Sequence, residues 1–132
     1  MKYIIDTHIL LWLIFDPERI DTHKLNLLKN PKNRIYVTNI SFWEISLKYA
    51  LGKLELQGLN PDELPQVANK MGIETHNLDS QCMASVYKLP KMPDHKDPFD
   101  RLIIWDCIQH GHTLISHDSA FKYYETIGLQ TI

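Results

Sequence analysis

Short runs of apolar residues alternate along the chain with longer segments in which apolar side chains recur at the spacing of one helix face. The short runs predict strands at residues 2–5, 34–38, 73–78 and 113–116, with a final edge strand at residues 129–132. The longer segments predict helices at residues 7–15, 21–29, 41–51, 59–71, 79–89, 98–109 and 120–124. No repeat, low-complexity tract or linker interrupts this alternation, so we expect one domain over residues 1–132.

Alternating strands and helices predict an α/β fold, because each helix carries the chain back to begin another parallel strand. Right-handed crossovers of this kind give a mainly parallel sheet, here of four to five strands, with helices on both faces. Such sheets bind ligands outside the carboxyl ends of their strands, where the strand order reverses. The chemistry of this chain is therefore expected at that rim.

Four acidic residues are placed to reach the predicted rim. Asp6 and Asp118 end strand-like runs, whereas Glu44 and Asp100 lie in the first turns of predicted helices. Like charges gathered at one rim repel, so such a cluster is tolerated only when a cation lies among them. Carboxylate oxygens are the ligands of hard divalent cations, so the sequence predicts a metal site.

Helix capping is an alternative explanation for several of these acids. Asp6 and Asp118 each stand at a strand-to-helix junction, where Asp is a preferred N-cap. Asp97 with Pro98 also forms a strong helix start. Since Asp97 already supplies that cap, capping leaves Asp100 unexplained.

Glu44 has a structural alternative as well. Ser41-Phe-Trp-Glu44 matches a capping box, in which the Glu side chain accepts a hydrogen bond from the Ser backbone. Glu44 and Lys48 are also spaced to form an ion pair on one helix face. The apolar neighbours of Glu44 argue against a carboxylate that is simply exposed to solvent.

Composition narrows the function classes. The chain has 132 residues, of which 44% are hydrophobic and 23% charged, which indicates a folded domain and not a disordered segment. A net charge of −2 excludes a generally basic nucleic-acid binder, so any polyanion must meet a local basic patch or a metal. Cys82 and Cys107 predict buried reduced thiols and a cytoplasmic setting. The apolar run at residues 8–15 is too short to span a membrane.

Several common catalytic motifs are missing. The chain has no G-x-x-x-x-G-K phosphate loop and no G-x-S-x-G nucleophile motif. Its seven histidines are scattered without H-x-x-x-H spacing, so a zinc site built on imidazoles is not expected. Ligation by carboxylates alone points to Mg²⁺ or Mn²⁺, and these ions suit phosphodiester chemistry.

The ordered set of motifs resembles the PIN-domain ribonucleases, in particular the VapC-type toxins of toxin–antitoxin pairs. The resemblance spans essentially the whole chain and rests on Tyr3-Ile-Ile-Asp-Thr-His8, Trp43-Glu-Ile-Ser-Leu-Lys48, Leu51-Gly-Lys-Leu54, His95-Lys-Asp-Pro-Phe-Asp-Arg-Leu-Ile103 and Leu114-Ile-Ser-His-Asp118.

The resemblance implies a single three-layer α/β/α domain, dependence on Mg²⁺ or Mn²⁺, and endonuclease activity on RNA. It places Asp6, Glu44 and Asp100 on the three main acidic positions of the family and Asp118 on a more variable fourth. Asp97 belongs to the branch-specific motif and is less clearly a ligand. A small antitoxin protein is the implied partner.

Two other functions remain open. One is a metal-free RNA-binding or antitoxin-interacting module whose acids are helix caps. The other is a phosphatase-like haloacid fold, which is disfavoured because its Asp-x-Asp motif would need an acid at His8. Lys48, Arg101 and the lysines of residues 91–96 are candidate phosphate contacts.

The aromatic content also favours a homodimer. Two stretches offer more aromatic surface than one small core needs: Trp12, Leu13 and Phe15, and Trp43 and Tyr49. The alternative is that all of these side chains belong to the core.

Overall fold

The computed structural model describes all residues, 1–132. Its sheet has five strands, all parallel, in the order β3-β2-β1-β4-β5. Their bounds are Lys2–Ile5 (β1), Arg34–Thr38 (β2), Ile73–His76 (β3), Thr113–Ile115 (β4) and Gln130–Thr131 (β5). This confirms the predicted α/β class and the parallel sheet.

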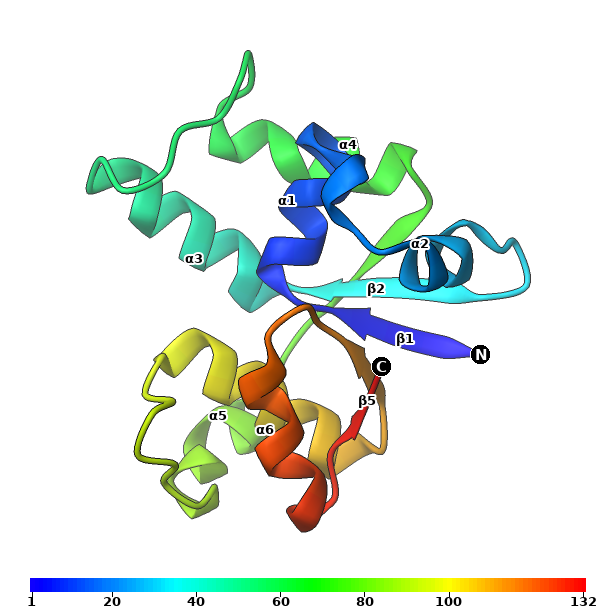
Figure 1. Cartoon of the computed structure of the whole chain (residues 1–132). Helices are drawn as coiled ribbons and strands as arrows, with labels where there is room; N and C mark the ends of the chain where they lie inside the picture. The colour runs from blue at the N-terminus through cyan, green and yellow to red at the C-terminus, as the bar shows by residue number, and fades with distance from the viewer.

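Six α-helices and four short 3₁₀ segments connect the strands (Figure 1). The α-helices are Thr7–Phe15 (α1), Thr22–Lys29 (α2), Asn39–Ala50 (α3), Leu64–Lys70 (α4), Ser80–Ser85 (α5) and Pro98–His110 (α6). The 3₁₀ segments are Pro17–Arg19 (η1), Pro61–Glu63 (η2), Val86–Lys88 (η3) and Ser119–Ile127 (η4). No helix has the length and apolar character needed to cross a membrane.

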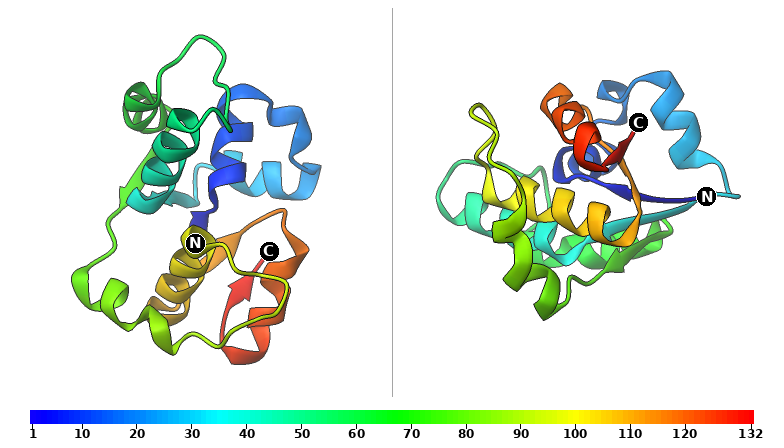
Figure 2. Two further views of the ribbon diagram at one scale, coloured as in Figure 1. Left: turned by 90° about the vertical axis from the view of Figure 1, so that its left-hand side faces the viewer. Right: turned by 90° about the horizontal axis from the view of Figure 1, so that it is seen from below.

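The helices cover both faces of the sheet and give three layers. Figure 1 shows α1, α2 and α4 on one side of the strands and α5 and α6 on the other, and Figure 2 shows the same layers from two further directions. Each face has its own core because side chains alternate along a strand. Ile5 packs into the core beneath α1 and α4, whereas its neighbour Ile4 packs into the core beneath α6.

Aspartate caps begin most of the helices. The side chains of Asp6, Asp21, Asp79 and Asp97 accept hydrogen bonds from backbone N–H groups in the first turns of α1, α2, α5 and α6. Each cap satisfies a donor that has no partner inside its helix. The predicted N-cap roles of Asp6 and Asp97 are therefore confirmed.

The start of α3 differs from the prediction. The helix follows β2 without a break and begins at Asn39, so that Ser41 and Glu44 lie inside it. The predicted capping box of Ser41 and Glu44 is therefore wrong, and the Glu44 carboxylate is free to face another element. Asn39 accepts a hydrogen bond from the backbone N–H of Leu78 instead, at 3.1 Å.

Other elements are shorter or tighter than predicted. The strand predicted at residues 73–78 ends at His76, and the helix predicted at residues 79–89 changes to 3₁₀ geometry after Ser85. The helix predicted at residues 120–124 is part of the longer 3₁₀ segment η4. Cys82 and Cys107 are buried free thiols, as expected.

Candidate active site

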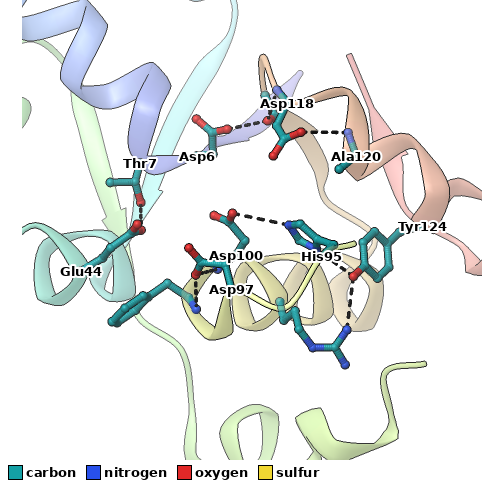
Figure 3. Close-up of polar contacts among 12 residues, drawn as sticks. Asp6, Thr7, Glu44, His95, Asp97, Asp100, Asp118, Ala120 and Tyr124 are labelled. Carbon is teal, nitrogen blue, oxygen red and sulfur yellow. Dashed lines mark hydrogen bonds and ion pairs between the residues drawn. The ribbon is translucent and has the colours of Figure 1, made fainter. Parts of the chain in front are cut away.

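The strand order brings distant parts of the sequence to one rim. β2 and β3 extend to one side of β1, and β4 and β5 extend to the other, so the order reverses beside β1. Asp6 follows β1 directly and Asp118 follows shortly after β4. Glu44 on α3 and Asp100 in the first turn of α6 approach from below, as Figure 3 shows. The structure therefore brings together all four acids expected at the rim.

Asp6 is held rigidly at the centre of this rim. Its side chain is 1% exposed. Its Oδ1 accepts a hydrogen bond from Ile9 N at 2.8 Å, and its Oδ2 accepts one from the hydroxyl of Ser116. Burial raises the pKa of Asp6, although these two hydrogen bonds favour the charged form. One carboxylate therefore both caps α1 and joins the ends of β1 and β4.

Glu44 is buried to the same degree and is oriented by groups from two helices. Its Oε1 lies 2.7 Å from Thr7 Oγ1, which also lies 2.8 Å from Ser41 Oγ. Its Oε2 forms an ion pair with Lys48 one turn further along α3. The Glu44 carboxylate is thus fixed at the edge of the space that Asp6 and Asp100 enclose (Figure 3).

Lys48 is the cation of the cluster. Partial burial alone would lower the pKa of its ammonium, but the neighbouring Glu44 carboxylate, with Asp97 and Asp100 further away, more than offsets that effect. The pKa of Lys48 is therefore raised, and the side chain stays charged. Its Nζ also lies 4.0 Å from Asp97 Oδ2.

Asp100 is destabilised in its charged form by its surroundings. Burial raises its pKa to about 8, and the charges of Asp97, Glu44, Asp6 and Asp118 act in the same direction. An acid with this pKa is largely protonated at neutral pH unless a cation stabilises its charge. The four surrounding carboxylates are near enough to Asp100 to define one shared site.

Asp97 and Asp118 lie on the border of the site and both cap helices. Asp97 Oδ1 accepts hydrogen bonds from Phe99 N at 2.9 Å and Asp100 N at 3.2 Å. Asp118 Oδ1 accepts one from Ala120 N at 2.9 Å. The second oxygen of Asp97 lies 4.0 Å from Lys48 Nζ, and that of Asp118 forms no hydrogen bond or ion pair.

His95 also borders the site, although in the sequence it stood out only as the first residue of the motif at residues 95–103. It is buried, and its Nε2 lies 3.5 Å from Asp100 Oδ2 without forming a hydrogen bond. Its Nδ1 lies 2.8 Å from the hydroxyl of Tyr124 on η4. Burial lowers the pKa of His95, although Asp118 and Asp97 oppose the shift. The ring is held by a residue distant in sequence, so no local pattern could reveal its position.

Two further histidines border the opposite side of the site. One ring nitrogen each of His8 and His117 and an oxygen of Asp6 lie within 4.8 Å of one another. Both rings are exposed, and their centroids are 5.0 Å apart. Burial lowers the pKa of His117, against the effect of Asp6.

Hollows with mixed basic and acidic walls flank the site on both sides. A groove of about 570 Å³ adjoins Thr7 and Glu44, and its walls include Arg19, Lys48 and Lys53 as well as Asp16 and Glu55. A smaller hollow of about 260 Å³ lies beside Asp118, Lys24 and Lys122, and Asp21 also lines it. An extended anionic chain crossing the acids would therefore meet lysines on either side, interspersed with carboxylates.

Arg101 is not free to contact a phosphate, which corrects the expectation from its sequence position. Its guanidinium donates hydrogen bonds to the carbonyl oxygens of Leu89 at 2.8 Å and Pro90 at 3.1 Å, and to the hydroxyl of Tyr124 at 3.2 Å. These contacts hold the loop before α6 against Tyr124 on η4. Arg101 therefore supports the residues of the site from behind.

We expect Arg101→Lys to lower the free energy of unfolding by about 1–3 kcal/mol, because a single ammonium cannot span the three acceptors. Lys96→Gln is a control in the same loop, with an expected change within about 0.5 kcal/mol. Urea unfolding measures both. A phosphate contact would instead leave stability unchanged and reduce the salt slope of RNA binding by about 1.

The donor set fits a hard divalent cation. Five carboxylates surround the site, and Lys48 is the only lysine or arginine that pairs with any of them. Their free atoms are oxygens, the ligands that Mg²⁺ and Mn²⁺ prefer. Burial and the neighbouring carboxylates raise the pKa of Asp100, and a bound cation would stabilise its charged form against both effects.

Comparisons with known proteins agree with this architecture. The model of the PIN domain family matches residues 3–126. Similar solved structures include VapBC2 from Rickettsia felis bound to a promoter DNA fragment, with 21% identity and a TM-score of 0.66 over 100% of this chain and 98% of that chain. VapBC-1 from nontypeable Haemophilus influenzae gives 20% identity and a TM-score of 0.67, with coverage of 100% and 97%.

DNA-bound VapBC from Salmonella typhimurium has 17% identity and a TM-score of 0.60, again with coverage of 100% and 97%. A search of curated proteins gave no match. At these identities the solved structures show a shared fold, whereas the family model covers nearly all of the sequence. The chain therefore belongs to the PIN domain family.

Proposed function

We propose that this protein is a metal-dependent endoribonuclease and the toxin of a type II toxin–antitoxin pair. The observation that carries the nuclease proposal is the convergence of four carboxylates on Asp100, whose pKa is raised to about 8. Membership of the PIN domain family supports the same reaction class. Perturbed titratable groups of this kind, next to a groove, are typical of catalytic sites.

In the proposed site Asp6 and Asp100 would hold the principal Mg²⁺ or Mn²⁺ ion. Glu44 would ligate it directly or through water, and Asp118 would complete the shell or support a second ion. Such an ion, when bound, neutralises phosphate charge and lowers the pKa of water at the site.

The side chains that surround the acids position them. The Ser116 hydroxyl fixes one oxygen of Asp6, so the carboxylate cannot rotate away from the rim. The Thr7 hydroxyl fixes Glu44 in the same way. Lys48 keeps a positive charge beside Glu44 and is available to a phosphate oxygen at the mouth of the groove. Lys53 on one side of the acids and Lys122 on the other are candidate contacts for neighbouring phosphates.

A nuclease assay with purified protein tests the proposal. Single-stranded RNA should be cut in Mg²⁺ or Mn²⁺, protected by EDTA, and cut again when the metal is restored. The Lys122→Gln variant should cut with a higher KM and little change in kcat. A protein that binds RNA equally well with and without EDTA but leaves it intact would support the metal-free binding module instead.

The antitoxin part of the proposal rests on an exposed apolar face of α3. Trp43 is 59% exposed, Leu47 one turn further along α3 is also exposed, and Leu51 directly after the helix is 59% exposed. A face of this kind is typical of a protein interface. A small antitoxin encoded beside this gene is the proposed occupant, because the motifs of the chain resemble VapC-type toxins and similar solved structures are named VapBC. Pairing of two copies of this chain stays a prediction.

A further inference from the structure

Three histidines outside the acidic site gather near the far end of α6. His76 ends β3, His110 ends α6, and His112 precedes β4. One nitrogen of each ring lies within 4.8 Å of one nitrogen of the other two. The ring centroids are 5.4 Å apart for His76 and His112, 5.7 Å for His110 and His112, and 5.9 Å for His76 and His110. The histidines are scattered along the sequence, but the fold brings these three together.

A fully buried carboxylate lies behind these rings. Asp106 is one turn before His110 on α6 and is 0% exposed. Its Oδ1 lies 3.0 Å from His110 Nδ1, and its Oδ2 lies 3.0 Å from His76 Nε2. Asp106 Oδ2 forms no well-aligned hydrogen bond, and no lysine or arginine pairs with the carboxylate. A buried charge without a fixed cation is costly, so the surrounding imidazoles, or an ion they hold, must compensate it.

Simple pairing of protonated histidines with Asp106 accounts for only part of this arrangement. It would involve His76 and His110, each through the nitrogen that faces the carboxylate, and would leave the other nitrogen of each ring free. His112 forms neither an ion pair with Asp106 nor a side-chain hydrogen bond.

We propose that His76, His110 and His112 bind a borderline transition-metal ion, with Zn²⁺ the preferred species, and that Asp106 orients two of the rings. With Zn–N distances of about 2.0–2.1 Å, three tetrahedrally arranged imidazoles would have ring centroids about 5 Å apart. The observed separations are close to this value. A carboxylate behind a ligating histidine is the usual support in zinc sites. Imidazole ligands select Zn²⁺ over Mg²⁺, so this site differs in kind from the acidic cluster.

The proposed ion would link three separate segments of the fold. It joins the edge strand β3 to the last turn of α6 and to the residue that leads into β4. The ten residues from Asp100 to His110 span about 15 Å of helix, so the two sites lie at opposite ends of α6. The role of the site is therefore structural, and its occupancy is expected to raise the melting temperature.

Binding of Zn²⁺ and Co²⁺ to the full chain tests the proposal, with Asp6→Asn as the background to weaken ion binding at the acidic site. Calorimetry should show one Zn²⁺ per chain, and bound Co²⁺ should show the intense visible absorption of tetrahedral ligation. His112→Gln should abolish both signals, and Asp106→Asn should weaken Zn²⁺ binding about 10–100-fold. His23→Gln, which removes an imidazole from α2, should change neither signal.

The second readout is the melting temperature, which Zn²⁺ should raise in the Asp6→Asn background but not after His112→Gln or His110→Gln. These two rings are at least partly exposed, so both variants should fold, and circular dichroism without metal checks this. Zn²⁺ affinity and Co²⁺ absorption that survive both substitutions would overturn the proposal. Absence of binding to the background protein itself would overturn it equally.

Discussion

Asp100→Asn should abolish RNA cleavage while leaving the metal-free fold intact or more stable. The substitution keeps the size of the side chain and one hydrogen-bonding oxygen but removes the charge that a hard cation needs. If Asp100 were only an acid in the first turn of α6, the change would cost at most about 1 kcal/mol of helix-dipole interaction and little activity. If it is a ligand, cleavage should fall by orders of magnitude. Burial and repulsion raise the pKa of Asp100 to about 8, so removing its charge should not lower, and can raise, the stability of the metal-free protein.

Asp97→Asn is the matched control, one helical turn away in the same sequence motif. Asn is as good an N-cap as Asp, so the bonds from Phe99 N and Asp100 N can be kept. We expect this variant to keep most of its stability and much of its cleavage rate. Robust Mg²⁺-dependent cleavage by purified Asp100→Asn protein would remove that residue from the metal site.

Divalent metal should stabilise the protein, and the effect should grow as the pH rises. Two carboxylates about 5 Å apart repel by about 3 kcal/mol at an effective dielectric constant near 20. A metal at 100 times its dissociation constant adds about 2.7 kcal/mol to the free energy of unfolding. Without metal, folded Asp100 keeps a proton up to a pKa of about 8, whereas the unfolded chain loses it near 3.8. The contribution of this residue to stability is therefore present below about pH 4 and is lost as the pH rises towards 8.

Thermal melts in Mn²⁺, Mg²⁺ and EDTA across this pH range measure both effects. The lowered pKa values of His95 and His117 act in the opposite direction near pH 6.5, so wild type should be compared with Asp100→Asn at each pH. The stability of the variant relative to metal-free wild type should increase between pH 4 and 8. Melting temperatures indifferent to all three additives would argue strongly against a shared site.

The fold and the acidic rim were predictable because their signals are local. Each strand is a short apolar run bounded by polar residues. The carboxyl ends of parallel strands lie at the same edge of the sheet. Asp6 and Asp118 follow such strands, so their meeting followed from the topology. Glu44 reached the same place for a different reason than predicted: α3 starts at Asn39, and the carboxylate faces Thr7.

The features that the sequence did not reveal depend on partners that are distant along the chain. Arg101 binds the backbone carbonyls of Leu89 and Pro90, and no pattern of side chains encodes carbonyl positions. His95 is placed by Tyr124 on η4. His76 at the end of β3 meets His110 and His112 from the end of α6 and the start of β4 only in the folded chain. Such contacts depend on how distant segments pack together, which local sequence patterns do not encode.

The aspartate that caps α1 makes inactivation of this protein unusually simple in genetic terms. Asp6 accepts the N–H of Ile9 with one oxygen and the hydroxyl of Ser116 with the other, and it is also a proposed metal ligand. Asn keeps an oxygen for the cap but lacks the charge that a hard cation needs, and Asp and Asn codons differ by a single base. A single base change in the Asp6 codon would therefore yield an inactive protein with the same surface. Such a protein could still bind its partner without cutting RNA. Alanine at the same position would also remove the helix cap, so a loss of activity could not be separated from a loss of stability.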